Sequence, residues 1–149
     1  MTASELQDYL HDHIPLSRAM RVAVERFDDD SVVLSAPLAP NINHRETVFG
    51  GSAAAVAILA AWSLLHTRLG SGGVSRRLVI QRHTMQFDLP IDGDFTARSH
   101  IEPDAWAIFV RALERKGRAR ITVSSVLECD GSTVASFDGT FVALTVQEG

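Results

Sequence analysis

The chain has 149 residues, of which 46% are apolar and 21% charged, so its length and composition are those of one globular domain with a sizeable core. The formal net charge of −4 argues against a nucleic-acid-binding protein, the single cysteine excludes an internal disulfide, and the first residues lack the basic start and apolar run of a signal peptide. We therefore expect one domain over residues 1–149, located in the cytoplasm, with no nucleic-acid or membrane partner and no metal or other cofactor.

The first part of the chain predicts a helix followed by a β-hairpin. Ser4 and Gln7 resemble a capping box. Apolar residues follow at helical spacing (Leu6, Leu10 and Ile14), and the helix should end before Pro15. Alternating stretches at 21–27 and 31–36 predict two strands, and the three aspartates between them predict a turn. A loop over residues 37–48 should follow.

The longest predicted element is an alanine-rich helix from about Gly50 to Leu69. Small residues share one face of the helix (Gly50, Ala54, Ala57 and Ala61), so a sheet could approach this face closely. Large apolar residues share another face (Ile58, Trp62, Leu65 and Leu69). Residues 48–65 carry no charge but are only marginally long enough to span a membrane, so a buried helix wrapped by a sheet is the better interpretation. Three glycines should end the helix (Gly70, Gly72 and Gly73).

The rest of the chain predicts four strands and one short amphipathic helix. The helix should begin at Pro103 and stop at Gly117. The strands and turns are expected at 78–89, 95–101, 121–127 and 134–146, with turns at Asp92-Gly93 and Asp130-Gly131. An antiparallel sheet around one long helix is an α+β architecture.

The junction between the loop and the long helix is the most informative segment for function. The first turn of a helix has backbone N–H groups without partners, and the helix dipole makes that end positive. Gly50 and Gly51 have no side chains, so a ligand could approach these N–H groups closely. Such a place suits an anion or a polarised carbonyl, although a crowded helix crossing is another reason for two adjacent glycines.

Three segments carry a resemblance to a known family, and together they span nearly the whole domain. They are Asn41-Ile42-Asn43 with Thr47-Val48-Phe49-Gly50-Gly51-Ser52, the strand end at 87–95, and the tail at 117–144. The order of elements around them resembles the hotdog fold. The closer resemblance is to the putative thioesterase family typified by the C-terminal domain of the bacterial YiiD protein.

The resemblance implies both a structure and an activity. The structure would be a curved antiparallel sheet around a central helix. The activity would be hydrolysis of an acyl thioester of coenzyme A or acyl carrier protein, as in fatty acid metabolism. Hotdog proteins usually form homodimers whose sheets join edge to edge, so a homodimer, or a tetramer built from dimers, is expected. The active site would then lie at the dimer interface, with the thioester carbonyl near the helix N-terminus.

The chain also departs from the pattern of related enzymes. In phenylacetyl-CoA-type thioesterases an Asn precedes a His-Gly-Gly by six positions, and an acid follows that His by nine residues. Here Asn43, Gly50 and Gly51 match, but Phe49 replaces the His and Ile58 replaces the acid. No acid lies anywhere from residue 48 to residue 69, so the usual water-activating group is missing.

Hydrolysis of a thioester needs donors for the carbonyl oxygen and a base for the attacking water. The N–H groups of Gly50 and Gly51 could supply the donors, with Gly51 the better candidate. Asn43 could hold the carbonyl or the water, or it could brace the loop. His44 and Glu46 are the nearest candidate bases, and a solvated loop charge is the alternative role of Glu46.

Further residues are expected to contact the substrate. Thr47, Phe49 and Ser52 flank the glycines, and Ser52 could instead cap the helix. His83 should share an apolar strand face with Val79, Met85, Phe87 and Leu89, either as a hydrogen-bonded core residue or as a group that reaches the partner's site. Asp88 lies on the opposite face and is expected to be structural.

Two groups of basic residues could bind the phosphates of the carrier, or they could simply be charged side chains in contact with solvent. The first group is Arg111, Arg115, Lys116, Arg118 and Arg120, and the second is Arg76, Arg77 and Arg82. Large apolar residues could line an acyl slot or simply form core (Trp62, Met85, Phe87 and Trp106). Two other functions stay open: a non-hydrolytic module that binds the acyl thioester, motivated by the missing acid, and, less favoured, a hotdog dehydratase.

Overall fold

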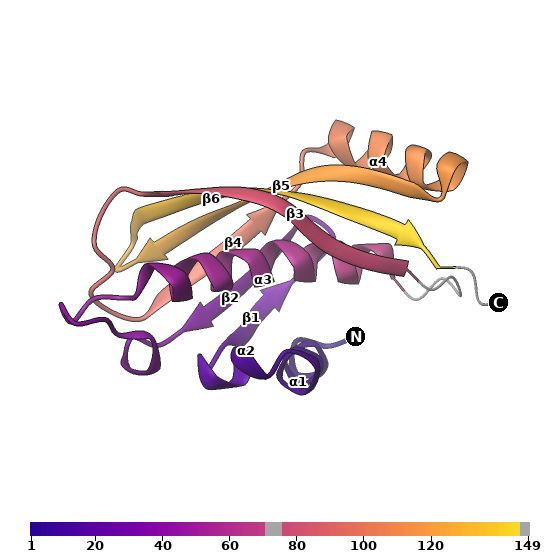
Figure 1. The fold of residues 1–149 in the computed structure, drawn as a ribbon. Coiled ribbons are helices and arrows are strands. Elements are labelled where there is room, and N and C mark those ends of the chain that lie inside the picture. Colours follow the sequence, from indigo (N-terminus) through magenta and orange to yellow (C-terminus); the bar gives the residue numbers. More distant parts are fainter. Residues whose placement is uncertain (71–75, 147–149) are drawn as a thin grey trace.

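One long helix is wrapped by a six-stranded antiparallel sheet in the computed structural model, which describes residues 1–70 and 76–146 (Figure 1). The strand order in the sheet is β1-β2-β4-β5-β6-β3, and every neighbouring pair is antiparallel. The strands are β1 (Ala23–Phe27), β2 (Ser31–Ala36), β3 (Arg76–Phe87), β4 (Phe95–His100), β5 (Arg118–Cys129) and β6 (Ser132–Thr145). The predicted α+β architecture is confirmed.

The helices follow the sequence expectations except near the N-terminus. They are α1 (Ala3–His13), α2 (Pro15–Ala19), the 3-10 turn η1 (Ala39–Asn41), α3 (Gly50–Leu69) and α4 (Pro103–Lys116). The predicted capping box is wrong, because Thr2 caps α1 by accepting a hydrogen bond from the Glu5 N–H at 3.1 Å. Pro15 ends α1 as expected but also opens α2, a position where its fixed φ and missing N–H cost nothing.

Small residues allow the sheet to approach α3 closely. Ala57 and Ala60 are fully buried, and their backbone carbonyls accept hydrogen bonds from the sheet. Ser125 Oγ on β5 donates to Ala57 at 3.1 Å, and Ser99 Oγ on β4 donates to Ala60 at 2.9 Å. Both hydroxyls are therefore satisfied inside the core, and they fix the helix against the strands. Of the predicted small face, Ala57 and Ala61 are buried while Gly50 and Ala54 are half-buried, and Ala60, which was not expected on that face, makes the second contact.

By length and composition α3 could also cross a bilayer, yet half of its apolar window is buried inside the protein. The core helix of a sheet-wrapped fold meets the same criterion. The helix ends at Gly70, which has a φ of +68° and donates its N–H to the His66 carbonyl. Gly72 and Gly73, which were also expected to end it, lie outside the described residues.

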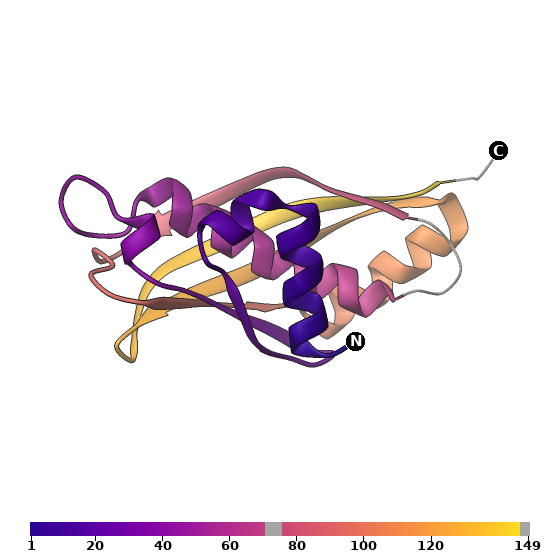
Figure 2. The same ribbon diagram turned by 90° about the horizontal axis from the view of Figure 1, so that it is seen from below.

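The N-terminal helix α1 lies across α3 (Figure 2). Four rings stack where the two helices meet: Tyr9 and His13 from α1, and Trp62 and His66 from α3. The Tyr9 and Trp62 rings each lie 4.7 Å from the His66 ring, centroid to centroid. Burial, and then the neighbouring His13, lower the pKa of His66, so this imidazole favours its neutral form.

The edge strand β3 contains a β-bulge that the sequence pattern did not predict. Ile80 pairs with Phe141 of β6 and Arg82 pairs with Thr140, so Gln81 is an extra residue between them. The expectation that Val79 shares a face with His83 is therefore wrong. The extra residue reverses the alternation, and Val79 faces outward beside Val142.

Candidate functional site

An open cavity of about 350 Å³ lies where α3 begins. The loop before α3 forms one wall, and the end of β3 with the turn after it forms the other. The cavity is lined by Thr47, Val48, Gly50, Phe87, Asp88, Leu89, Pro90 and Ile91. Most of these residues are apolar, with a few polar groups beside the helix end, which is the usual composition of a small-molecule site.

The loop before α3 is held in place by backbone hydrogen bonds to the rest of the fold. The Val48 N–H donates to the Ile91 carbonyl, and the Phe49 N–H donates to the Asn41 carbonyl, each at 2.8 Å. The Asn41 side chain is itself buried and donates to the carbonyls of Met20 and Pro37. These bonds bring the loop against the turn after β3 and so create the cavity.

Asn43 braces this loop from inside. Its Nδ2 donates to Thr47 Oγ1 at 2.9 Å, and its Oδ1 accepts from the N–H groups of Arg45 and Thr47 at 2.8 and 3.2 Å. Glu46 completes the tight turn with a φ of +63°, a left-handed conformation that a non-glycine residue adopts only where its surroundings hold it there. These hydrogen bonds brace the loop and hold Thr47 in the cavity wall.

The N-terminus of α3 is accessible and uncapped. Phe49 is the N-cap residue, and within residues 1–70 and 76–146 no side chain, that of Ser52 included, accepts a hydrogen bond from the first turn. The Ala53 N–H donates to the Phe49 carbonyl, which leaves the N–H groups of Gly50, Gly51 and Ser52 available. Because Gly51 is exposed, a ligand can reach them.

Two aromatic rings lie against the glycines at this helix end. A Cβ atom placed on Gly50 would lie 3.5 Å from Cζ of Phe87, within the cavity. A Cβ on Gly51 would overlap the ring of Phe49, which is 58% exposed and folds back over the helix. The missing side chain of Gly51 leaves room for the Phe49 ring, and that of Gly50 leaves room beside Phe87 in the cavity wall.

The two predicted bases lie outside the cavity. His44 and Glu46 are exposed on the loop, and neither contributes to the cavity wall in the described part of the chain. Asp88, which was expected to be only structural, is the one ionisable residue among the eight that line the cavity. Its Oδ1 accepts a hydrogen bond from Gln86 Nε2 at 3.0 Å. The signal for this residue was its position directly after a strand that ends beside the helix N-terminus.

The remaining predicted residues are spread over the molecule. His83 lies on the inner face of β3, exposed, with its ring 5.4 Å from that of Phe137, so it is not a core residue. Of the four large residues considered for an acyl slot, only Phe87 lines the cavity. Trp62 belongs to the ring stack with α1, and Trp106 lies under the Arg68 guanidinium at 4.3 Å, near the other end of α3.

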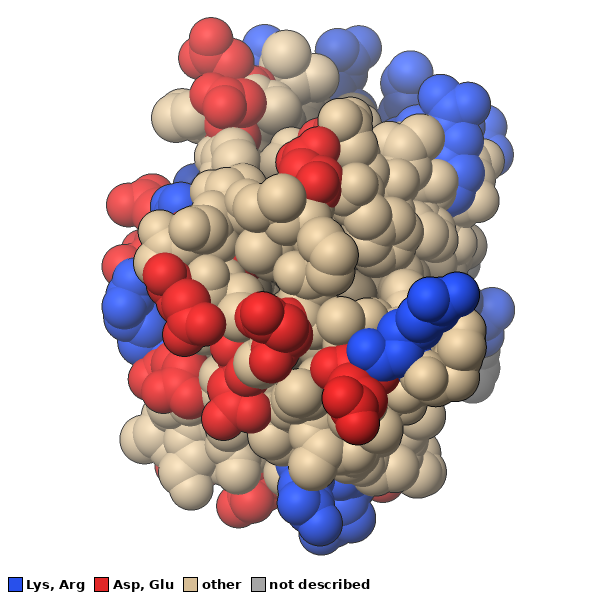
Figure 3. All heavy atoms as spheres, turned by 90° about the vertical axis from the view of Figure 1, so that its left-hand side faces the viewer, with Lys and Arg blue, Asp and Glu red and all other residues tan. Residues whose placement is uncertain are grey.

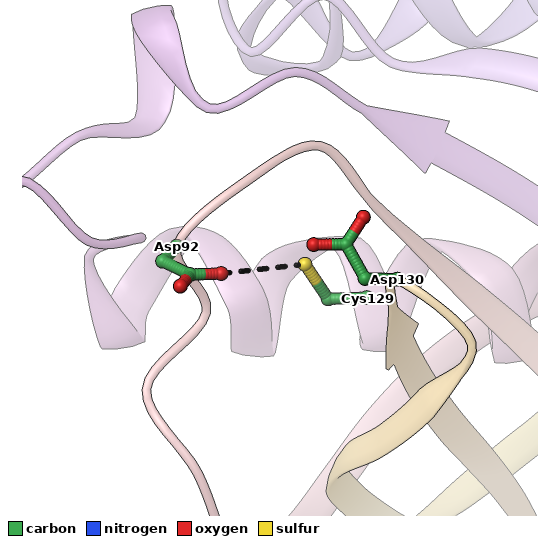
Figure 4. A group of neighbouring side chains, drawn as sticks. All are labelled: Asp92, Cys129 and Asp130. Carbon is green, nitrogen blue, oxygen red and sulfur yellow. Dashed lines mark hydrogen bonds between the residues drawn. The ribbon is translucent and has the colours of Figure 1, made fainter.

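Carboxylates gather around the end of the molecule where α3 begins (Figure 3). Asp92 and Asp130 flank the buried Cys129, and ligand-type atoms of the three residues lie within 4.8 Å of one another (Figure 4). The Cys129 thiol donates a weak hydrogen bond to Asp92 Oδ1 at 3.9 Å. Burial, followed by the charges of Asp130 and Asp92, raises the pKa of Cys129, so the thiol stays protonated and acts as a structural contact.

Comparison with known proteins finds similarity over nearly the whole chain. A family model described as "Putative thioesterase (yiiD_Cterm)" matches residues 3–145. A crystal structure of a protein of unknown function from Chlorobaculum tepidum is 29% identical, with a TM-score of 0.87, and the match covers 97% of this chain and 94% of that one. A putative thioesterase from Shewanella oneidensis is 27% identical over 95% of this chain and 96% of that one, with a TM-score of 0.85.

A thioesterase from Haemophilus influenzae shares the fold at 13% identity, with a TM-score of 0.80 over 99% of this chain and 94% of that one. These likenesses confirm the expected hotdog fold.

Proposed function

Because the chain belongs to the putative thioesterase family of the YiiD C-terminal domain, we propose that it hydrolyses an acyl thioester in the cavity where α3 begins. The observation that supports this most is the uncapped start of α3, where free backbone N–H groups meet an apolar cavity. The substrate would be an acyl thioester of coenzyme A or of acyl carrier protein. Its acyl chain would lie against Phe87, Leu89 and Ile91.

The helix N-terminus supplies the electrostatic part of the reaction. When water attacks the carbonyl carbon, the carbonyl oxygen becomes an oxyanion, and the N–H groups of Gly50 and Gly51 would donate hydrogen bonds to it. The helix dipole favours the same negative charge. Collapse of the tetrahedral intermediate then breaks the carbon–sulfur bond, and the thiolate leaves and takes up a proton. The products are a carboxylic acid and a free thiol.

Three residues are candidates for activating the water. Asp88 lines the cavity, whereas His44 and Glu46 lie on the adjacent loop and could reach a bound substrate only from outside the wall. We favour Asp88 on this geometry. Asn43 would act as a positioning residue through Thr47, which lines the cavity. Phe49 and Ser52 flank the two glycines outside the cavity wall and would contact the substrate from there.

A second copy of the chain would complete the site. β3 is an edge strand of 12 residues, and it ends at Phe87, one of the apolar residues that line the cavity. Phe87 and Leu89 are 51% and 52% exposed, and His83 is exposed on the inner face of the same strand. An unpaired edge of this length favours pairing with another strand. Pairing through β3 would bury these residues and bring the partner's β3 next to the cavity.

Steady-state hydrolysis of acyl-CoA and acyl-carrier-protein thioesters tests the proposal. Removing the base should lower kcat by about 10²-fold or more, so Asp88→Asn, His44→Gln and Glu46→Gln are compared with Asp29→Asn in an exposed turn. We expect the large loss only in Asp88→Asn. If all four variants hydrolyse as fast as the parent, none of the three is the base. If no thioester is hydrolysed at all, the proposed activity is wrong.

A non-hydrolytic binding module is the alternative, and the absence of any carboxylate from α3 favours it. Such a module would bind acyl thioesters in the same cavity and release them unchanged. Saturable binding of a non-hydrolysable thioether analogue, together with no turnover of the matching thioester, would select this function. Turnover that depends on Asp88 would exclude it.

A further inference from the structure

The outer face of the sheet, opposite to α3, carries a groove that the proposed hydrolysis does not use. It has a volume of about 500 Å³ and is lined by Gln81, Arg82, Arg120, Thr122 and Thr140. We propose that this groove, here called the arginine groove, binds a phosphate group of the thioester's carrier. This inference rests on the proposed function only for the identity of that carrier.

The strand register places the polar groups on one face. Thr140 of β6 pairs with Arg82 of β3 on one side and with Thr122 of β5 on the other, so the three residues form one row across neighbouring strands. Arg120 lies two residues before Thr122 in β5 and therefore points to the same face. The two arginines thus flank β6, and their strands are separated by about 10 Å, which is twice the spacing of neighbouring strands.

The β-bulge in β3 adds a fifth polar side chain. Gln81 is the extra residue, and a bulge allows two consecutive side chains to lie on one face of a sheet. Gln81 and Arg82 both line the groove for this reason. The groove therefore offers two guanidinium groups, one amide and two hydroxyls, and all five can donate hydrogen bonds.

The charges of the groove are positive and free. Among the described residues neither Arg82 nor Arg120 has an ion-pair partner, and no carboxylate lines the groove. Asp138 lies two residues from Thr140 on β6, where it accepts a hydrogen bond from Ser124 Oγ. Arg82 lies in the Thr140 row and Arg120 in the Val142 row, so the two exposed guanidinium groups flank the threonine hydroxyls diagonally across β6. Guanidinium groups in such a position supply donors that phosphate oxygens accept.

The groove also extends toward further arginines. Leu144 of β6 pairs with Arg77 of β3 and with Arg118 of β5, so a second pair of arginines flanks β6 on the same face. Val142, which pairs with Arg120, separates Thr140 from Leu144 along this face of β6 and is uncharged. A carrier with more than one phosphate could therefore be held along β6.

Calorimetric binding of coenzyme A, pantetheine 4′-phosphate and pantetheine to the full chain tests the groove. The parent should bind both phosphorylated probes more tightly than pantetheine. The double variant Arg82→Gln with Arg120→Gln should lose about tenfold or more of the affinity for a phosphorylated probe and none for pantetheine. Arg26→Gln, an exposed strand arginine on the far edge of the sheet, should bind all three probes as the parent does.

The pattern of losses identifies the phosphate. A loss with both phosphorylated probes assigns the groove to the 4′-phosphate that the arm of a carrier protein also has, whereas a loss with coenzyme A alone assigns it to the nucleotide phosphates. Equal affinities of the double variant and the parent for coenzyme A would refute phosphate binding by the groove. An equal loss of affinity for coenzyme A in Arg26→Gln would refute it as well.

Hydrolysis of an unphosphorylated S-acyl pantetheine separates the two proposals. It should proceed in the double variant at the parent's rate if the cavity is catalytic. Binding of coenzyme A that depends on the two arginines, without turnover of any thioester, would refute the proposed function but support phosphate binding by the groove.

Discussion

Gly50→Ala should raise the stability of the fold but lower the proposed hydrolytic activity at the N-terminus of α3. The added methyl would meet Phe87 at 3.5 Å, an ordinary van der Waals contact, and Gly50 has no positive φ. The substitution therefore causes no clash, and it removes conformational freedom from the unfolded chain. Such Gly-to-Ala changes stabilise by about 0.4–1 kcal/mol, which corresponds to a rise of roughly 1–4 °C in Tm for a chain of this size.

The same methyl should reduce activity, because it enters the cavity beside the N–H groups that would hold the oxyanion. A displacement of the carbonyl by about 1 Å can cost on the order of 10²-fold in rate, so we expect kcat/KM to fall by at least about tenfold. Thermal unfolding and hydrolysis of one acyl-CoA are measured on the same preparation. A variant with a raised Tm and an unchanged kcat/KM would refute the placement of the carbonyl at Gly50. A lowered Tm would refute the packing argument.

Three further predictions address the rest of the molecule. Gly139→Ala should destabilise the protein by about 1–3 kcal/mol in urea unfolding, because the Cβ of the new alanine would lie 2.5 Å from Cζ of the buried Phe137. An unchanged urea midpoint would show that the Phe137 ring can move aside. Burial and His13 lower the pKa of His66 in the folded state, so the unfolded state binds a proton at this residue first as the pH falls below 6.5. Tm of the parent should therefore decline as the pH falls, and Tm of His66→Gln should decline less steeply. Equal slopes of Tm against pH in the two proteins would contradict this prediction. Asn43→Ala should lower kcat/KM and destabilise the loop by about 1–3 kcal/mol, and equal rates for variant and parent would remove Asn43 from the mechanism.

The long helix and its position could be predicted because its signals are local. Two glycines open it, Gly70 closes it, and its first 16 residues, 50–65, carry no charged side chain. Apolar residues without charges must be covered, and alternating strands before and after the helix provide the cover. The order of strands in the sheet was not specified by these signals, because it depends on contacts between distant parts of the chain.

The cavity was only half predicted for the same reason. The Gly50-Gly51 wall is visible in the sequence, since the two glycines mark the point where a polar loop meets an apolar helix. The opposite wall is formed by residues 87–91, and it reaches the helix only because the Val48 N–H bonds to the Ile91 carbonyl. No spacing rule connects those two positions. Asp88 was therefore interpreted as structural, and the loop residues His44 and Glu46 were preferred as bases.

The cap of the first helix shows a different limit. Thr2 and Ser4 both have hydroxyl side chains that can cap a helix, and the spacing from Ser4 to Gln7 favours the wrong one. Gln7 instead turns its Oε1 to the Val24 N–H of β1, at 3.0 Å. A tertiary contact thus decided between two local alternatives of similar energy.

The extra residue in β3 allows the two halves of that strand to keep their faces although their sequence patterns are out of phase. Arg77 and Arg82 have opposite parity in the sequence, yet both lie on the outer face, while Ile80 and Phe87 both lie on the inner face. Deleting Gln81 would make Ile80 and Arg82 successive residues of a regular ladder, so every later side chain of the strand would keep its face and only the Gln81 amide would be lost from the arginine groove. A relative aligned with a one-residue gap at this position could therefore still present residues equivalent to Arg82 and Phe87 on the same two faces of the sheet.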